Sequence, residues 1–454
     1  MKDNKNEIFE KTPVARAVLF NTIPARCSMV MVMIYNLADT FFVGRTGDPY
    51  MVAAVSYALP IFMIPSAIGN LFGIGGTSVI SRAMGRGDKG YARKVSSFCF
   101  WTGTVVGIVC TAVLLLFAAP ISRALGATSA ETFTYTRDYL AMVSWSSVFI
   151  VIANAFSNII RAEGQSLHAM AGMLIGNLVN IVLDPIFIFT LEGGIVGAAI
   201  ATSIGNIIGA MYYILYFLLH RSELSIHPRD YAVGGGIAGS VLAIGVPAAL
   251  TSILMSVSNI VVNGRMSGYG DLAVAGYGVD LKVHMIISNV VIGLGQGIQP
   301  LLGYCYGAGL KERYGKIMRF SVIYSLIVSS VLTVVCILGA GTLVGLFLED
   351  RAAFDYGVHF TVISLLSGPI CGVLYVLLNA LQARGAATCS FIVSVSRQGF
   401  VFFPMLFILH SYMGMDGLVW TQQFSDLISF VLAVVLYLVV SQKEKTNTKR
   451  SNKV

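Results

Sequence analysis

The sequence predicts an all-α integral membrane protein with twelve transmembrane helices, arranged as two six-helix bundles related by a pseudo-twofold axis along the membrane normal. The first observation is composition: 56% of the 454 residues are hydrophobic and only 11% are charged, about half the charge of ordinary soluble domains. The second is a series of long apolar runs, which must be helical because lipid offers backbone groups no other partners. The third is an internal repeat, which divides these runs into two sets of six.

Each apolar run is long enough to cross a bilayer as a helix. The first run follows a polar start without the pattern of a cleavable signal, so we expect it to be retained. The twelve expected spans cover approximately residues 16–43, 52–76, 95–118, 138–160, 167–190, 194–219, 238–263, 272–300, 317–344, 358–381, 388–410 and 415–440.

The repeat has an offset of 223 residues. Because six helices return the chain to the side where it began, the two halves are parallel, as in many alternating-access transporters. We expect an N-terminal lobe at residues 1–219, a cytoplasmic connector at 220–237, a C-terminal lobe at 238–440 and a cytoplasmic tail at 441–454. The matching pairs include Pro24 with Pro247, Ala25 with Ala248, Asn36 with Asn259, Gly47 with Gly270, and Asp48 with Asp271.

The net charge of +8 indicates topology rather than binding to nucleic acid. Of the 30 Lys and Arg residues, 22 lie at the two termini and in loops that alternate along the chain. The positive-inside rule therefore places both termini in the cytoplasm. The basic loops lie near Arg82–Lys94, Arg161, Arg221–Arg229, Lys311–Arg319 and Arg384.

An acidic residue, Asp39, lies inside the first apolar run. A charge there costs about 2.5–3.5 kcal/mol on insertion scales, so such residues are usually paired, inward-facing and functional. Tyr35 lies one helical turn earlier on the same face. The alternative is that Asp39 lies near the helix end and reaches water at the headgroups.

Polar residues at helical spacing occur on three further spans of the first half. We expect them to converge with Tyr35 and Asp39 on one inward-facing pocket. The alternative for Asp184 is a structural role at a kink before Pro185. The repeat-equivalent positions of the two acids are apolar, so the fold does not require acids there. The polar residues are Asn154 and Asn158 on the fourth span, Asn177, Asn180 and Asp184 on the fifth, and Thr202 and Asn206 on the sixth.

In the second half, Asp280 and His284 share a face of the eighth span, and Lys282 lies between them. Arg397 and Asp426 lie in later spans. A buried ion pair and a contact with substrate are both consistent with these charges. We expect the substrate cavity to be lined by Tyr35, Asn154, Asn158, Asn177, Asn206, Asp280, His284 and Gln296.

Four segments resemble the multidrug and toxic compound extrusion (MATE) family. They are YNLADTFFVGR at 35–45, ALPIFMIPSAIGNLFGIGGTSVISRAMGRGD at 58–88, GLGQGIQPLLGYCYGAG at 293–309 and NALQARG at 379–385. The similarity extends over essentially the whole chain, and the length and N-terminal pattern are similar to the DinF-like and MepA-like bacterial exporters of the family.

The resemblance implies a twelve-helix, two-lobed antiporter that exports cationic, lipophilic compounds in exchange for H⁺ or Na⁺ by alternating access. In the DinF-like branch the coupling cation binds an Asp on the first helix, an Asn and an Asp on the fifth, and a Thr on the sixth. The NorM-like branch adds acids on the seventh and tenth helices, and the corresponding spans 238–263 and 358–381 contain none. The implied site for H⁺ or Na⁺ is therefore Asp39, Asn180, Asp184 and Thr202.

The sequence also bears on two other function classes. A membrane enzyme is disfavoured because the chain has no HExxH, GxSxG or GxxxxGK[ST] motif, and its seven scattered cysteines suggest core residues rather than metal ligands. A lipid-linked oligosaccharide flippase would favour a basic cavity, whereas the clearest predicted pocket is acidic. We expect a monomer in the cytoplasmic membrane that transports small cationic drugs or dyes, with no cofactor besides the coupling ion and no nucleic-acid partner.

Overall fold

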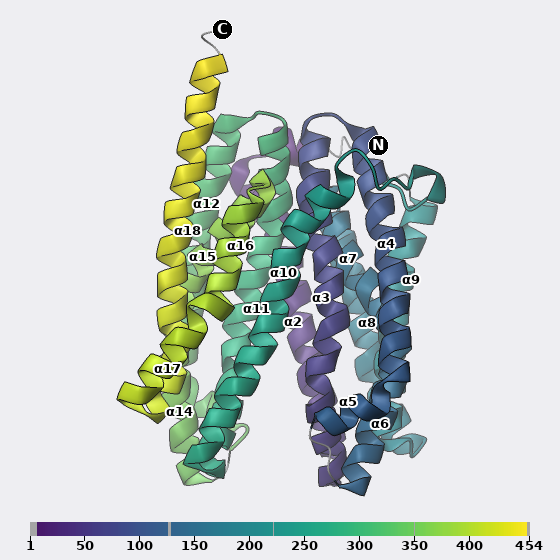
Figure 1. The fold of residues 1–454 in the computed structure, drawn as a ribbon, viewed down its shortest axis with the longest axis vertical. Helices are drawn as coiled ribbons and strands as arrows, with labels where there is room; N and C mark the ends of the chain where they lie inside the picture. Colours follow the sequence, from purple (N-terminus) through teal and green to yellow (C-terminus); the bar gives the residue numbers. More distant parts are fainter. Residues whose placement is uncertain (1–6, 126–128, 221, 349, 452–454) are drawn as a thin grey trace.

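The computed structural model describes residues 7–125, 129–220, 222–348 and 350–451. All regular elements within these ranges are helices, which confirms the predicted fold class (Figure 1). Arg221 and the outer ends of the expected N-terminal lobe and C-terminal tail lie outside the described residues. Both ends of the described chain lie at the same end of the molecule, the upper end in Figure 1.

The first half contains the helices up to residue 219. After a short α1 (Glu7–Glu10), they are α2 (Val14–Gly44), α3 (Pro49–Gly85), α4 (Lys89–Leu116), α5 (Ala118–Ala124), α6 (Ala130–Ser144), α7 (Ser147–Ala162), α8 (Ser166–Pro185), the π-helical turn η1 (Ile186–Thr190) and α9 (Gly194–Leu219).

The second half follows a connector that contains the 3₁₀ turn η2 (Pro228–Asp230). Its elements are α10 (Ile237–Met266), the 3₁₀ turn η3 (Ser267–Tyr269), α11 (Asp271–Gly307), α12 (Lys311–Leu338), α13 (Ala340–Gly345), α14 (Arg351–Leu365), α15 (Gly368–Arg384), α16 (Ala387–Val395), the π-helical turn η4 (Ser396–Phe400), α17 (Phe402–Met413) and α18 (Met415–Ser451).

Two of the twelve expected spans are bent. Ten described helical segments are long and apolar enough to cross a membrane, and the pairs α6–α7 and α14–α15, bent by 53° and 43°, bring the number to twelve. At the first bend, the hydroxyls of Ser144 and Ser146 donate to the carbonyls of Leu140 and Val143, which competes with the helical ladder. At the second bend, Pro369 stands at the start of α15, where it has no backbone N–H to donate.

The irregular elements recur in the same order in both halves. A short helix (α5 or α13) precedes the bent pair, and a π-helical turn follows the next helix after the pair: η1 follows α8 and η4 follows α16. In the first half this turn directly follows Pro185, whose missing N–H interrupts the regular ladder. The short helix, the bend and the π-helical turn therefore repeat in the structure as the two halves repeat in the sequence.

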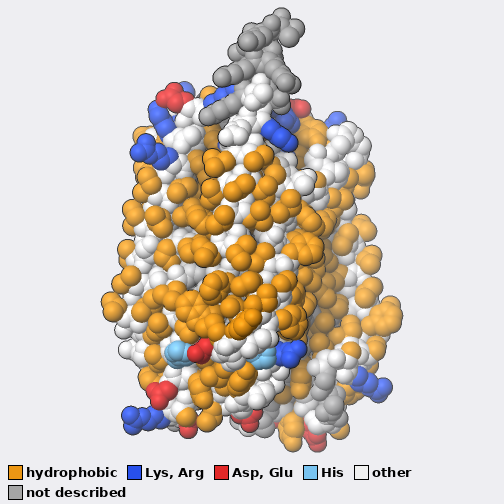
Figure 2. Space-filling model, turned by 60° about the vertical axis from the view of Figure 1, so that its left-hand side comes forward, with side chains coloured by type: hydrophobic (Ala, Val, Ile, Leu, Met, Phe, Trp, Pro, Cys, Tyr) orange, Lys and Arg blue, Asp and Glu red, His pale blue; other side chains and the backbone are white. Residues whose placement is uncertain are grey.

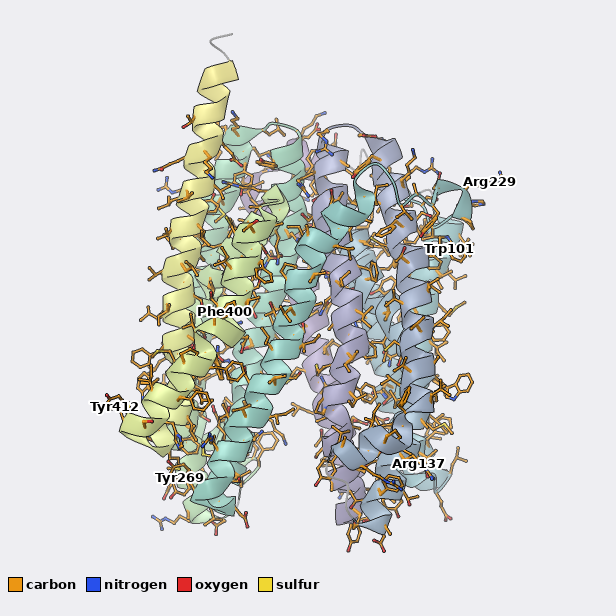
Figure 3. All side chains as sticks on the ribbon, viewed as in Figure 1. Trp101, Arg137, Arg229, Tyr269, Phe400 and Tyr412 are labelled. Carbon is orange, nitrogen blue, oxygen red and sulfur yellow. The ribbon has the colours of Figure 1, made fainter. Side chains whose placement is uncertain are left out.

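The outer surface matches a bilayer environment. Figure 2 shows hydrophobic side chains over the middle of one face and most charged side chains toward its two ends. Leu116 is 78% exposed and Leu338 is 83% exposed, and lipid contact accounts for such exposure of large apolar side chains. Arg229 lies near the upper end of the molecule and Arg137 and Tyr269 lie near the lower end (Figure 3).

The two halves approach closely along α2, α3, α10 and α11. A Cβ atom added to Gly297 of α11 would lie 2.7 Å from Cα of Thr22 and 2.8 Å from the carbonyl oxygen of Asn21, both on α2. Glycine is therefore required for the backbones to meet at this depth. Toward the lower end in Figure 1, α3, α5 and α6 diverge from α10 and α14.

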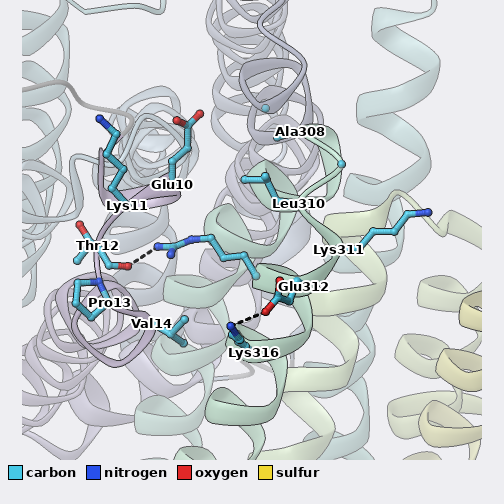
Figure 4. A pocket seen from close by; sticks show the side chains of 13 residues that line it. Glu10, Lys11, Thr12, Pro13, Val14, Ala308, Leu310, Lys311, Glu312 and Lys316 are labelled. Atoms are coloured by element: carbon cyan, nitrogen blue, oxygen red, sulfur yellow. Dashed lines mark hydrogen bonds and ion pairs between the residues drawn. The ribbon is translucent and has the colours of Figure 1, made fainter.

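Polar contacts also join the halves at the upper end. Tyr304 stacks on Phe9, with ring centroids 4.6 Å apart, and its hydroxyl donates to Glu10 at 2.6 Å. Arg313 donates to the backbone oxygen of Thr12 at 2.6 Å. These contacts border a hollow of about 1000 Å³ (Figure 4). In this hollow, Lys316 pairs with Glu312 at 2.7 Å, so these two charges are engaged with each other.

We expect Gly297→Val to prevent the close approach of α2 and α11, because its methyl groups would meet the α2 backbone. Overpacking of this kind costs about 1–3 kcal/mol. The free energy of unfolding in detergent should fall, and a cysteine replacing the buried Ser78, whose hydroxyl bonds Gln382 across the interface, should react faster with a water-soluble maleimide. The matched control is Gly278→Val on the same helix, where a Cβ meets nothing within 4 Å. Equal behaviour of the two variants would contradict the packing argument.

Candidate functional site

Three helices of the first half bring together the four side chains expected to bind the coupling ion. Asn180 Nδ2 lies 3.2 Å from Asp184 Oδ1 and 3.2 Å from Thr202 Oγ1, and it donates to both. Asn180 and Asp184 lie one turn apart on α8, while Thr202 is on the adjacent α9. Glycine permits this approach, since a Cβ on Gly205 of α9 would lie 3.0 Å from Cβ of Asn180.

The fourth side chain, Asp39, comes from α2, which packs along α8. Its charge acts on Asp184, and both carboxylates act on the hydroxyls of Tyr35 and Tyr139. Oδ1 of Asp39 is buried, so this atom does not reach water at the headgroups. The donor to Asp184 is the Asn180 side chain rather than a backbone group at the kink before Pro185.

Sequence reasoning missed Tyr139 of α6. This side chain is 3% exposed and lies within the electrostatic reach of both acids. In the sequence, Tyr139 is simply a tyrosine inside an expected span. Tyrosines in spans often serve only to pack helices together, and no helical spacing related this one to the other polar residues.

Three oxygens of this site have no hydrogen-bond partner among the described residues: Asp39 Oδ1, Asn180 Oδ1 and Asp184 Oδ2. Each is buried, and an unpaired buried acceptor costs about 1–3 kcal/mol. Asp184 is 0% exposed and Asn180 is 3% exposed, so water has little access to them. A bound proton or a hard cation would satisfy these acceptors.

The donor set favours a proton or Na⁺ over a transition metal. The described residues contain no group of three or more His, Cys, Asp or Glu side chains that could hold a metal ion. The site instead combines two carboxylates with one amide and one hydroxyl. Oxygen-only ligands of this kind suit hard cations.

The residues expected to line the substrate cavity fall into separate groups in the structure. Tyr35 adjoins the site just described. Asn177 and Asn206 lie near it by helical spacing, one turn from Asn180 and Thr202. Nδ2 of Asn177 is buried without a hydrogen-bond partner among the described residues. These three side chains therefore border the acidic site of the first half.

Asn154, Asn158 and Gln296 belong to a second group, at the contact between the two halves. Asn158 Nδ2 donates to the backbone oxygen of Asn154 at 3.0 Å. Arg161 donates to Asn158 Oδ1 at 3.0 Å and to Gln296 Oε1 of α11 at 3.1 Å. Gln296 therefore provides a hydrogen bond between the halves.

Arg161 was expected in a basic cytoplasmic loop, but the structure buries it. It is 1% exposed, and its bonded side-chain oxygens belong to neutral amides. Its Nε has no partner among the described residues. The signal that could have placed it correctly is its spacing of three from Asn158, which puts both on one helical face.

In the second half, the structure selects the ion pair among the two alternatives for Arg397 and Asp426. Arg397 Nε lies 2.7 Å from Asp426 Oδ1, and the side chains are 8% and 0% exposed. Arg397 also donates to the hydroxyl of Tyr375 at 2.7 Å. Asp426 accepts further bonds from Gln422, Ser367 and Cys371.

Asp280 and His284 make no hydrogen bond with the Arg397–Asp426 ion pair among the described residues. Asp280 is 2% exposed and accepts a hydrogen bond from Ser364 at 2.7 Å. Among the described residues no ion pair joins Lys282 to Asp280; the Lys282 ammonium instead lies 5.0 Å from the ring centroid of Phe347. Asp280 is thus enclosed within the second half rather than on an exposed wall.

A protein-family model and several known proteins match this chain. The MatE family model matches residues 24–186 and again residues 247–408. The chain is 30% identical over 452 residues to the multidrug export protein MepA of Staphylococcus aureus strain N315, covering 99% of each chain. It is also 30% identical over 440 residues to MepA of Staphylococcus saprophyticus, covering 97% of each.

Solved structures show the same fold. A MATE structure in complex with MaD3S superposes with a TM-score of 0.90 at 23% identity, covering 99% of this chain and 100% of that one. An outward-facing multidrug resistance MATE family transporter of the MOP superfamily gives a TM-score of 0.89 at 24% identity, with the same coverage.

We expect Arg397→Gln to destabilise the protein strongly, because it would leave the Asp426 carboxylate buried without its cation. Breaking a buried pair in this way costs about 3–5 kcal/mol. The midpoint of thermal unfolding in detergent measures the effect. Arg137→Gln is the control, since Arg137 pairs with Asp138 at 45% and 37% side-chain exposure and should contribute about 0–1 kcal/mol. Similar midpoints for both variants would contradict the structural role of the buried pair.

Proposed function

Because the chain belongs to the MATE family of multidrug exporters, we propose that it is a secondary active antiporter that exports cationic, lipophilic compounds in exchange for H⁺ or Na⁺ by alternating access. Membership of this family makes it a transporter and not an enzyme. The single observation that carries the ion-coupling proposal is the set of three unpartnered buried oxygens between α2 and α8.

In this proposal, Asp39, Asn180, Asp184 and Thr202 bind the coupling ion. With both carboxylates ionised, their repulsion and their removal from water raise the free energy of the empty site. A proton or Na⁺ relieves both costs. Asn180 positions the site, since its amide already holds Asp184 and Thr202 together.

The ion and the drug favour different conformations. Loading from outside neutralises the acids, weakens the attraction for an organic cation and favours its release outward. Loss of the coupling ion to the cytoplasm restores the negative charge and the state that binds the drug. Each ligand can shift the equilibrium only by its difference in affinity between the two states.

We further propose that residues 1–219 and 238–440 act as two lobes that rock against each other. The bond between Arg161 and Gln296 and the contact at Gly297 would break as the lobes separate at the end that carries the termini. The connector would move with the first lobe, because Trp101 and Ser97 of α4 donate to backbone oxygens of Ile226 and His227.

The cavity should favour flat, hydrophobic cations. The acids Asp39 and Asp184 lie within electrostatic reach of Tyr35, and aromatic faces attract cations. The flippase alternative has less support, because the buried basic group at the lobe interface, Arg161, is engaged by Asn158 and Gln296. Transport of anionic dyes as readily as cationic dyes would contradict this selectivity.

The number of protons determines which gradient drives export. Exchange of one monovalent cation for one proton is electroneutral, so the pH difference alone would drive it, at about 1.4 kcal/mol per unit. A second proton would add about 2.3 kcal/mol per 100 mV of membrane potential.

We expect Asp39→Asn and Asp184→Asn each to abolish gradient-driven export, because the amide cannot gain and lose the coupling proton and binds Na⁺ weakly. Export of a cationic dye from proteoliposomes, under separately imposed pH and sodium gradients, measures this. Asp138→Asn is the control, since Asp138 is a partly exposed acid on α6 paired with Arg137. Full export by either site variant, at wild-type expression and folding, would refute the assignment.

We expect both termini in the cytoplasm. A cysteine replacing Lys89 should then be protected from a membrane-impermeant maleimide added to intact cells, while a cysteine replacing Arg45 should react. The two positions lie at opposite ends of α3 and its flanking turns. Labelling of both from the same side would contradict the topology.

A further inference from the structure

We propose that Asp280 is a second proton-binding site, separate from the site between Asp39 and Asp184, which takes up an exchangeable proton on Oδ1. The site lies inside the second lobe, between α11 and α14. Asp280 Oδ2 accepts the Ser364 hydroxyl at 2.7 Å. Oδ1 is buried and has no hydrogen-bond partner among the described residues.

The other buried acid of this lobe, Asp426, provides the contrast. Asp426 is 0% exposed, like Asp280 at 2%. It is neutralised by Arg397 at 2.7 Å, and Gln422, Ser367 and Cys371 also donate to it. Its carboxylate therefore has a cation and several donors that favour the charged form. Asp280 has one neutral donor, and the described residues place no Lys or Arg in an ion pair with it.

The groups around Asp280 are mostly apolar. Val279, Val283 and Ile287 of α11, with Val344 of α13 and Leu365 of α14, form a buried cluster along this part of the lobe. Transfer of an isolated carboxylate into such surroundings is so costly that the group takes up a proton instead. The unpartnered Oδ1 is the atom on which that proton would bind.

The titratable and charged neighbours come from four elements. On α11 itself they are Tyr277, whose hydroxyl senses the Asp280 charge, and His284 one turn further. Ser364 on α14 holds the carboxyl group. Arg397 of η4 and Asp426 of α18 act electrostatically on His284, and they are already paired with each other.

His284 is a second titratable side chain on the same helical face, four residues after Asp280. Its Nδ1 is buried and has no hydrogen-bond partner among the described residues. Because Asp280 Oδ1 also lacks a partner, these two atoms are not bonded to each other, and the proton on Oδ1 is not shared with His284.

Protonation of Asp280 would also change the contact with α14. A carboxylate accepts the Ser364 hydroxyl more strongly than a neutral carboxylic acid does. Ser364 lies in the last turn of α14, directly before the bend of 43° to α15. Proton uptake would therefore weaken a bond at the bend, which offers a route from the proton to the position of α15.

The proton-binding part of this proposal is tested without transport. Infrared difference spectra of the purified full-length protein, between acidic and alkaline buffer, should show a carboxylic-acid C=O band that Asp280→Asn removes. The band should persist in the double variant Asp39→Asn with Asp184→Asn, and Asp138→Asn should leave the spectrum unchanged. An Asp280→Asn spectrum identical to that of the wild type would overturn the proposal.

A second variant keeps the test decisive if Asp280→Asn does not fold. Ser364→Ala removes the hydroxyl donated to Asp280, so the same band should shift in frequency while the protein stays folded. An unshifted band in Ser364→Ala would also overturn the proposal.

The role in transport rests on the antiporter function proposed above. Tetraphenylphosphonium export from proteoliposomes should depend on membrane potential in the wild type and lose this dependence in Asp280→Asn, while a pH gradient still drives it. Unchanged potential dependence in the variant would overturn the transport role. Absence of any export by the wild type would instead refute the proposed function, and the infrared result would stand by itself.

Discussion

The free-energy cost of holding a charge in apolar surroundings governs where the polar side chains of this protein lie. The structure meets this cost in different ways. Arg397 and Asp426 neutralise each other and are surrounded by further donors and acceptors. Arg161 is held by neutral amides at the contact between the halves. At Asp39 and Asp184 the cost is left partly unmet, because three nearby oxygens lack partners. A proton or a small cation bound there would supply the missing partner.

The two halves share their backbone plan and differ in their chemistry. Both have a short helix, a bent pair and a π-helical turn in the same order. Asp39 and Asp184 of the first half lie on α2 and α8, while Asp280 and Asp426 of the second half lie on α11 and α18. The repeat therefore supplies two similar frames, and each frame carries its own set of buried charges. The buried ion pair of Arg397 and Asp426 belongs to the second half, whereas the side chains proposed to bind the coupling ion belong to the first.

Helix α2 connects the acidic site with the contact between the halves. Asp39 lies near one end of this helix, and Thr22 near the other end packs against Gly297 of α11. A close-packed contact of this kind has few intermediate arrangements, because a small separation already loses much of its dispersion energy. Asp39 and the contact at Gly297 therefore lie on one continuous helix, with Pro24 between them.

The sequence by itself determined the fold class and the twelve apolar segments, and it placed Asp39, Asn180, Asp184 and Thr202 in a larger set of polar residues at helical spacing. The resemblance to the MATE family singled out these four. The segments and the polar set follow from local properties: the length of an apolar run, the helical period that places residues on one face, and the cost of a charge within the run. Only the tertiary structure decided that Tyr139 joins this group, that Arg161 is buried against Gln296, and that Asp426 pairs with Arg397 while Asp280 does not pair with Lys282. Helical periodicity fixes the direction of a side chain on its own helix, but the identity of the side chain opposite depends on how the helices pack against one another.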